Sequence, residues 1–178
     1  MDQIPNMQST GMLFIVATPI GNLEDITLRA IRTLKEANFI LAEDTRHSGI
    51  LLKKYEITTP LLSFHSYSPE GKIKKLMELL GEGKHLALIS DAGMPGISDP
   101  GYVLIKQAVE SGLTVTVIPG ASAAVTAVVA SGLPCHRYTY LGFLPLKKGR
   151  VKLIESLRDA PYTVCFYEAP HRIQRTLS

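Results

Sequence analysis

Residues 86–101 read Leu-Ala-Leu-Ile-Ser-Asp-Ala-Gly-Met-Pro-Gly-Ile-Ser-Asp-Pro-Gly, an apolar run followed by a loop rich in Gly and Pro. The apolar residues at its start predict a buried strand. Glycines let a ligand approach the backbone closely, and prolines hold a loop in shape without supplying N–H donors. We therefore expect a binding loop at residues 90–101, in which Asp99-Pro100 starts the next helix.

Similar apolar runs recur along the chain, and helical patterns separate them. This alternation predicts an α/β protein with a largely parallel sheet. The expected strands are Met12–Ala17, Phe39–Ala42, Leu61–Phe64, Leu86–Ile89, Val115–Ile118, Tyr138–Leu141 and Thr163–Tyr167.

Two helices have a clear apolar stripe. On the first, at residues 28–37, Leu28, Ile31 and Leu34 share one face. On the second, the shared residues are Ile73, Leu76, Met77 and Leu80. Ser68 is expected to cap the second helix, with Pro69 as its first residue.

The chain is expected to contain two α/β domains, with a boundary near residues 119–122. Residues 1–120 form the first, with a Rossmann-like parallel sheet. Residues 121–178 start a second domain, which we expect to be truncated at its C-terminus because the chain stops inside a predicted helix.

The composition is that of an ordinary globular protein, with 46% hydrophobic and 20% charged residues among 178. The longest apolar run, Ala121–Ala130, is about half the ~20 residues that a membrane helix needs. Cys135 and Cys165 are the only cysteines and show no metal-ligand spacing. We therefore expect a soluble cytoplasmic protein with no disulfide framework, no metal and no membrane partner.

The net charge of +3 is unevenly distributed. Residues 1–134 contain 11 basic and 13 acidic side chains, whereas residues 135–178 contain 8 basic and 3 acidic ones. Such a basic segment is typical of a polyanion-binding protein, but a solvated surface has the same pattern. The candidate phosphate contacts are Lys147, Lys148, Arg150, Lys152 and Arg158.

Polar and Gly-rich loops follow the first five strands at their carboxyl ends, where open parallel sheets bind ligands. They contain residues 19–22, 43–46, 65, 91–99 and 120–122. From this position alone, Asp44 and His65 are candidate catalytic proton acceptors, and Arg46 is a candidate partner for a phosphate or carboxylate. Alternatively, residues 43–46 form only a capped, salt-bridged turn.

Glu168, directly after the last strand, has two interpretations. It is either a functional carboxylate or a strand-end charge that reaches water. The usual phosphate-binding fingerprints, G-x-G-x-x-G after the first strand and G-x-x-x-x-G-K-[ST], are absent from the chain.

Five motifs occur in an order that resembles a known family. They are Val16–Leu23, Ala42–Arg46, Ser90–Gly93 with Asp99–Gly101, Ile118–Gly120 and Phe166–Arg172. The chain resembles the tetrapyrrole-methylase-like methyltransferases over nearly its whole length from Met12 on. The resemblance implies two α/β domains with S-adenosylmethionine in the cleft between them, and a homodimer.

Within that family, the motifs are similar to those of enzymes that methylate the ribose 2′-oxygen of a cytidine in the decoding region of 16S ribosomal RNA. The resemblance thus implies 16S rRNA, within the small ribosomal subunit, as the partner. It implies cofactor contacts at Asp91, Gly93, Met94, Pro95, Ile97, Ser98, Ser122, Ala123 and Tyr167.

This sequence departs from the family's pattern in two ways. Met94 stands where the family usually has Thr, and the family's members continue past Ser178. Two alternative functions stay open. One is a methyltransferase of the same fold that acts on a tetrapyrrole precursor, and the other is a non-catalytic fragment that binds RNA or the ribosome.

Overall fold

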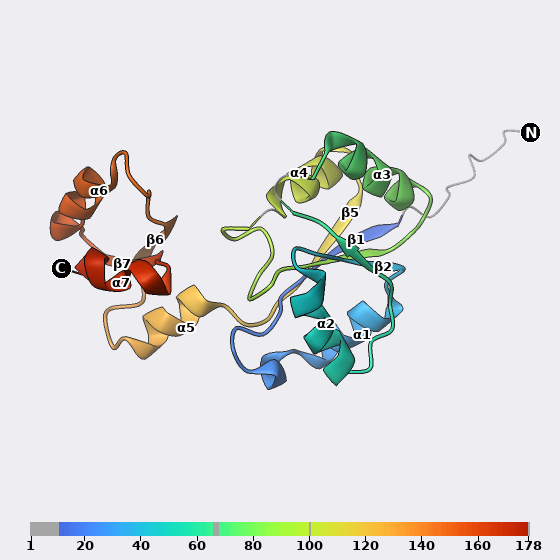
Figure 1. Cartoon of the computed structure of the whole chain (residues 1–178), viewed down its shortest axis with the longest axis horizontal. Helices are drawn as coiled ribbons and strands as arrows, with labels where there is room; N and C mark the ends of the chain where they lie inside the picture. Colours follow the sequence, from blue (N-terminus) through green and yellow to red (C-terminus); the bar gives the residue numbers. More distant parts are fainter. Residues whose placement is uncertain (1–10, 66–67, 100, 178) are drawn as a thin grey trace, which may run out of the picture. The chain divides into compact units, whose positions relative to one another are not determined.

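A computed structural model describes residues 11–65, 68–99 and 101–177. The chain divides into two compact units (Figure 1). Unit 1 ends at Ala121, and unit 2 begins at Ser122. Unit 1 contains β1 (Met12–Val16), η1 (Leu23–Asp25), α1 (Leu28–Glu36), β2 (Phe39–Ala42), α2 (Thr45–Lys54), β3 (Leu61–Ser63), α3 (Glu70–Gly81), β4 (Leu86–Ile89), α4 (Tyr102–Glu110) and β5 (Thr114–Ile118). Unit 2 contains α5 (Ala123–Ala130), β6 (Tyr138–Phe143), α6 (Arg150–Ser156), η2 (Leu157–Asp159), β7 (Thr163–Tyr167) and α7 (Pro170–Leu177).

Unit 1 is built on a parallel sheet with the strand order β3-β2-β4-β1-β5, which confirms the expected α/β fold. Helices α1 and α2 cover one face and α3 and α4 cover the other (Figure 1). All four residues of the central strand β4 are buried. Val16 pairs with both Ile89 and Ile118, so the loops that follow β1, β4 and β5 begin at the same edge of the sheet.

The expected stripe on α1 is wrong at its first residue, since Leu28 is 85% exposed. The buried residues of α1 are Ala30, Thr33 and Leu34. The hydroxyl of Thr27 accepts the N–H of Ala30, so Leu28 is the first helical residue. The stripe that faces the sheet therefore begins two residues later. On α3, the expected stripe is confirmed: Leu76 and Leu80 are buried, and the other two residues pack against the same cluster.

Two expected helix caps are also wrong. Pro69 occupies the N-cap position of α3, whereas the Ser68 hydroxyl accepts the backbone N–H of His65. Helix α4 begins at Tyr102, and the Asp99 carboxylate accepts N–H groups of the loop before it. Both side chains stabilise loops because a Ser or Asp accepts nearby N–H groups in a turn as readily as at a helix start.

In unit 2, the strands β6 and β7 form a parallel pair against which α5 packs. The side chain of Glu168, at the end of β7, is 1% exposed and lies between two guanidinium groups. Oε2 accepts a hydrogen bond from Arg150 Nη2 and Oε1 accepts one from Arg172 Nε, both at 2.7 Å. These bonds hold the pKa of Glu168 well below its usual range.

The structure contradicts two expectations for this region, one for Glu168 and one for Arg150. The prediction that Glu168 is a strand-end charge reaching water is wrong, because its carboxylate is buried and joins β7 to α6 and α7. Arg150 was expected to contact phosphates, yet its side chain is 17% exposed and donates to Glu168. Lys147, Lys148, Lys152 and Arg158 are exposed.

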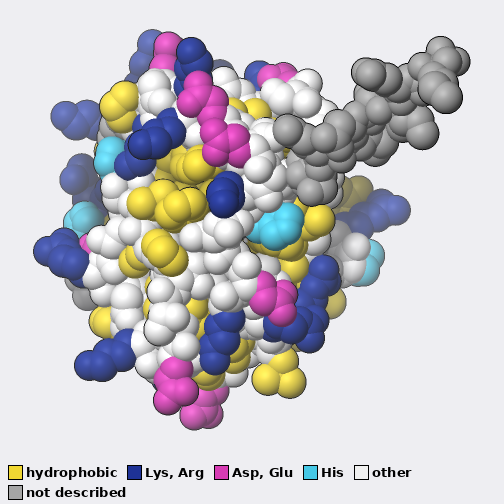
Figure 2. All heavy atoms as spheres, turned by 90° about the vertical axis from the view of Figure 1, so that its right-hand side faces the viewer, with side chains coloured by type: hydrophobic (Ala, Val, Ile, Leu, Met, Phe, Trp, Pro, Cys, Tyr) yellow, Lys and Arg dark blue, Asp and Glu magenta, His cyan; other side chains and the backbone are white. Residues whose placement is uncertain are grey.

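On the face in Figure 2, Lys and Arg side chains are interspersed with Asp and Glu and surround small apolar areas. Within the described residues, no helix combines the length and the apolar character needed to cross a bilayer.

Candidate functional site

A short backbone bridge joins the loop after β1 to the loop after β4. Thr18 and Gly93 form an isolated antiparallel pair, in which each N–H donates to the other carbonyl at 2.9 and 3.1 Å. Buried Thr18 also donates its hydroxyl to the carbonyl of Ser90 at 3.0 Å, and Ser90 Oγ donates to Gly93 O. These bonds fix the two loops relative to each other.

The loop after β4 has an unusual backbone. Gly93 and Gly96 have φ of +83° and +89°, and Ser98 has φ of +63°. Asp99 Oδ1 accepts the N–H groups of Gly96 and Gly101, at 2.7 and 2.9 Å, which closes the loop on itself. Gly93 and Gly96 have a left-handed backbone conformation that strains other residues, which explains why Gly occupies both positions.

The loop after β5 approaches the loop after β1 closely. A Cβ atom on Gly120 would lie 2.9 Å from the Cβ of Ala17, too close for any other residue without movement of the backbone. Since Ala17 N also donates to Ile118 O at 3.2 Å, three of the five predicted rim loops lie together.

Negative charge gathers on this rim. Partial burial raises the pKa of Glu43, the charges of Asp91 and Asp99 raise it further, and His65 lowers it. Asp91 Oδ1 accepts the backbone N–H of Asp44 at 3.2 Å, which joins the loops after β2 and β4. Sequence reasoning placed Glu43 on the rim but not among the candidate site residues, because its proximity to Asp91 and Asp99 depends on the fold.

The three candidate catalytic residues differ in what their side chains do. Asp44 caps α2 by accepting the N–H groups of Arg46 and His47, and its carboxylate pairs with the Arg46 guanidinium at 3.2 Å. These contacts lower the pKa of Asp44. The Arg46 side chain is 92% exposed. His65 is exposed after β3, and within the described residues its imidazole makes no hydrogen bond.

The residues that the resemblance implied for the cofactor fall into two groups. Asp91, Gly93, Met94, Pro95, Ile97 and Ser98 lie together on the loop after β4 in unit 1. Ser122 and Ala123 lie at the start of α5, and Tyr167 lies at the end of β7, next to the rings of Tyr140 and Phe143 in unit 2. Met94 packs against the apolar cluster beneath α3 and α4.

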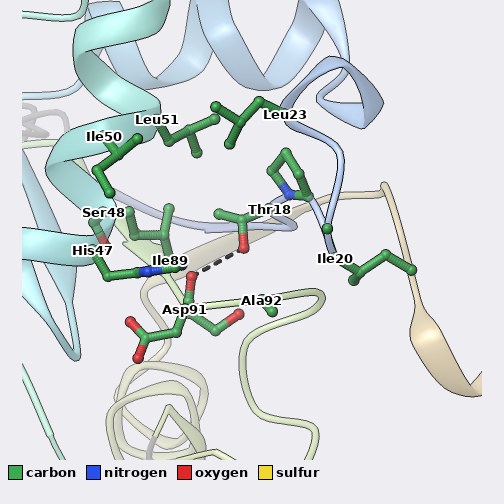
Figure 3. A pocket seen from close by; sticks show the side chains of 13 residues that line it. Thr18, Ile20, Leu23, His47, Ser48, Ile50, Leu51, Ile89, Asp91 and Ala92 are labelled. Carbon is green, nitrogen blue, oxygen red and sulfur yellow. Dashed lines mark hydrogen bonds between the residues drawn. The ribbon is translucent and has the colours of Figure 1, made fainter.

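A pocket of about 300 Å³ opens beside the bridge. We call it the Ser48 pocket; residues 18–23, 47–51 and 89–92 contribute its walls. Figure 3 shows His47 and Ser48 beside Ile50 on one side, with Ile20 on the opposite side and Leu23 next to Leu51. Sequence reasoning missed Ser48 and His47, since nothing in the helical pattern of α2 sets them apart.

Residues 12–178 match the protein family described as Tetrapyrrole (Corrin/Porphyrin) Methylases. The chain belongs to this family. The match confirms the family expected from the five motifs. As a member of the tetrapyrrole methylases, the chain also resembles the X-ray structure of cobalt-precorrin-4 methyltransferase, a cobalamin biosynthetic enzyme, with a TM-score of 0.70. That likeness covers 99% of this chain and 75% of the other at 16% identity, so it concerns the fold alone.

Two curated relatives are much closer in sequence. The chain is 54% identical over 168 residues to ribosomal RNA small subunit methyltransferase I of Halalkalibacterium halodurans. This alignment covers 94% of this chain and 58% of that protein. It is 50% identical over 167 residues to the protein of the same name from Thermotoga maritima, covering 94% and 75%. The chain therefore spans little more than half of the first relative's length.

The left-handed backbone of Gly93 leads to a stability prediction. Gly93→Ala should lower the free energy of unfolding by about 1–2 kcal/mol, because an L-residue at positive φ is strained even where space is available. Gly81→Ala, at a helical position with open space around it, should raise that free energy by about 0.5–1 kcal/mol. Urea denaturation measures both, and equal effects of the two substitutions would contradict the assignment.

The charge cluster leads to a pH prediction. The pKa of Glu43 is raised, so the folded chain binds this proton more tightly than the unfolded chain. The Glu43 contribution to stability should therefore fall as pH rises from 4.5, its ordinary pKa, through its raised pKa in the folded chain. A carbon-detected NMR titration of the Glu43 carboxyl should show a midpoint above 4.5 that decreases in Asp91→Asn. An unchanged Glu43 midpoint in Asp91→Asn would show that the Glu43 and Asp91 carboxylates do not interact.

Proposed function

We propose that this chain is part of an S-adenosylmethionine-dependent methyltransferase that methylates the 2′-oxygen of a cytidine ribose in the decoding region of 16S ribosomal RNA. The observation that carries this proposal is the 54% identity to a relative named ribosomal RNA small subunit methyltransferase I, over an alignment of 168 residues. The joined rim loops support it, because they supply a binding edge at the carboxyl ends of the strands.

The rim residues fit the proposed cofactor. When bound, S-adenosylmethionine supplies a methyl group on a positively charged sulfur, ready for transfer to an oxygen nucleophile. The carboxylates of Asp91 and Asp99 lie close enough to Glu43 to raise its pKa, and this gathering of negative charge favours a cationic ligand. Gly93 and Gly96 leave the backbone of the loop free of side chains.

We propose that the residues implied by the family resemblance hold this cofactor. They are Asp91, Gly93, Met94, Pro95, Ile97, Ser98, Ser122, Ala123 and Tyr167.

The chain's own residues would mainly position the two reactants. Holding a ribose oxygen in line with a methyl carbon contributes on the order of 7–11 kcal/mol to lowering the barrier. Of the rim candidates, we propose His65 as the acceptor of the hydroxyl proton, worth about 10²–10⁴-fold in rate. Exposed Arg46 would bind an RNA phosphate, and Asp44 would position Arg46 through their ion pair.

The first test is a calorimetric titration of the chain with S-adenosylhomocysteine, the product-side analogue of the cofactor. One-to-one saturable binding is the expected result. The same titration on a chain extended beyond Ser178 serves as the control, and absence of binding to both chains would overturn the proposal. Retained RNA binding with no cofactor binding would favour a non-catalytic RNA-binding protein.

The second test identifies the substrate. Incubation with labelled S-adenosylmethionine and small ribosomal subunits should transfer one methyl group to the RNA. A ribose 2′-O-methyl group blocks alkaline cleavage at the adjoining phosphate, so the cleavage pattern identifies the nucleotide. An absorbance titration with porphyrinoid compounds tests the tetrapyrrole alternative, and tight binding there with unmodified RNA would favour it.

We further propose that the protein acts as a homodimer in the cytoplasm, where ribosomal subunits are assembled. Exposed apolar side chains on unit 2 support association, since water-exposed apolar surface favours burial in an interface. They include Val125, Val129, Leu133, Phe143, Leu146 and Val151. Light scattering at increasing protein concentration should give the mass of a dimer.

A further inference from the structure

The Ser48 pocket, which lies within unit 1, is lined by both apolar and polar side chains. Its larger apolar side chains come from three segments and are Ile20, Leu23, Ile50, Leu51 and Ile89. Its polar side chains include His47, Ser48 and Asp91 (Figure 3). Its volume of about 300 Å³ lies at the small end of the range for ligand pockets. A flat ligand with apolar faces and a polar edge can contact both kinds of side chain.

Ser48 adds an independent observation. The residue is 3% exposed, and among the described residues its hydroxyl oxygen is buried without a hydrogen-bond partner. A buried hydroxyl that has lost water and gained no partner is destabilising. Rotation of the side chain toward the pocket would let this hydroxyl donate to an acceptor on a ligand there.

We propose that the Ser48 pocket accepts a pyrimidine base that has turned out of an RNA strand, and that it prefers cytosine. This inference deepens the proposed function and rests on it. Enzymes that act on a nucleotide within a strand read the unstacked base through its Watson–Crick edge and enclose its faces with apolar side chains. The polar and the apolar side chains that line the pocket provide those two kinds of contact.

The polar side chains of the pocket match the edge of cytosine. The 4-amino group of cytosine donates hydrogen bonds, and the Asp91 carboxylate accepts them; Oδ1 already accepts from Asp44 N, which leaves Oδ2 for a ligand. N3 and O2 of cytosine are acceptors, for which the Ser48 hydroxyl and the His47 ring supply donors. In uracil an oxygen replaces the amino group and would face the carboxylate, so uracil is disfavoured.

The pocket shares Asp91 with the residues proposed for the cofactor, but residues 94–98 of that set do not line it. The Thr18–Gly93 bridge separates it along the loop from residues 94–98, which the family resemblance implies for the cofactor. A base held in the pocket and a cofactor on residues 94–98 would therefore contact opposite ends of the same loop.

The experiment is an NMR titration of the chain with cytidine, uridine and adenosine 5′-monophosphates at millimolar concentrations. Cytidine monophosphate should shift the amide signals of residues 47–51 and 89–92 in a saturable way, and the other two should bind about tenfold more weakly. Ser48→Ala should weaken cytidine monophosphate binding by about 5–10-fold. Stability should not fall in this variant, because the hydroxyl makes no hydrogen bond in the described part of the chain.

Two further variants sharpen the test. Asp91→Asn keeps an acceptor for Asp44 N but presents an amide donor, so the preference should move from cytidine toward uridine. Ser131→Ala, in unit 2, is the matched control and should leave nucleotide binding unchanged. Absence of shifts in the pocket at millimolar cytidine monophosphate, or equal shifts with all three nucleotides, would overturn the inference.

Titration of the same samples with S-adenosylhomocysteine keeps the two proposals distinguishable. Shifts of residues 47–51 caused by S-adenosylhomocysteine alone would assign the pocket to the cofactor and overturn the base-binding inference. Cytidine binding in the pocket without any S-adenosylhomocysteine binding, here and in the extended chain, would support the pocket and overturn the proposed function.

Discussion

Glu168→Gln is expected to lower the melting temperature of the chain by more than about 10 °C. The substitution preserves shape but removes the negative charge between Arg150 and Arg172, whose guanidinium groups lie 2.7 Å from the two carboxylate oxygens. Breaking a buried ion pair costs far more than breaking an exposed one, because the remaining charges stay desolvated. Thermal unfolding followed by circular dichroism, with amide exchange to locate the change in unit 2, measures the effect.

The matched control is Glu110→Gln, which removes the exposed pair of Lys106 and Glu110 at 3.7 Å. An exposed pair on one helix contributes little, so its melting temperature should stay within about 2 °C of the unsubstituted chain. Equal shifts for the two substitutions would show that burial of the Glu168 carboxylate does not matter.

Acid should abolish the difference between the unsubstituted chain and Glu168→Gln. The pKa of Glu168 is lowered in the folded chain, so its ionised carboxylate contributes full stability above the ordinary pKa of 4.5. That contribution is lost as pH falls from 4.5 toward the lowered value. The two melting temperatures should therefore converge in acid.

Replacing Lys147, Lys148 and Lys152 together by Ala is expected to weaken binding to 16S rRNA by about 10²-fold at low salt. Each lysine that neutralises a phosphate contributes about 0.7–0.9 to the slope of log affinity against log salt, so the slope should flatten by about 2–3. All three side chains are exposed, whereas neighbouring Arg150 is held by Glu168. Fluorescence anisotropy with a decoding-region fragment at several salt concentrations gives both values.

The control replaces three exposed lysines of unit 1, Lys74, Lys75 and Lys84, by Ala. This variant has the same net charge as the first, so it separates local contacts from a general loss of positive charge. Equal weakening by both variants would rule out a phosphate-binding role for residues 147–152. Arg150→Ala is unsuitable for this purpose because it also breaks the Glu168 network.

Much of the fold could be predicted because its determinants are local. The apolar run Leu86–Ile89 predicted the strand that lies at the centre of the sheet, fully buried. The glycines at 93 and 96 predicted a loop after this strand; in the structure both lie in that loop and have positive φ. The stripe on α3 was also correct, since helical periodicity alone brings its residues to one face.

Local patterns failed where two structures compete for the same residues. Leu28 fits a helical stripe, yet the start of α1 directs it outward. Ser68 and Asp99 are good capping residues, but each accepts N–H groups of its own loop instead. Capping and loop bonds use the same short side chains, and the surrounding backbone decides between them.

Sequence patterns were enough to predict the strands, the Gly-rich loops and the family of this protein, because periodicity and motif spacing are properties of the chain alone. Which side chains meet depends on the fold. Glu168 accepts a hydrogen bond from Arg150, which lies 18 residues earlier in the chain. Asp44 N donates to Oδ1 of Asp91, which lies 47 residues later. The Ser48 pocket needs three segments that the strand order β3-β2-β4-β1-β5 brings to one edge, and no spacing in the chain shows that order.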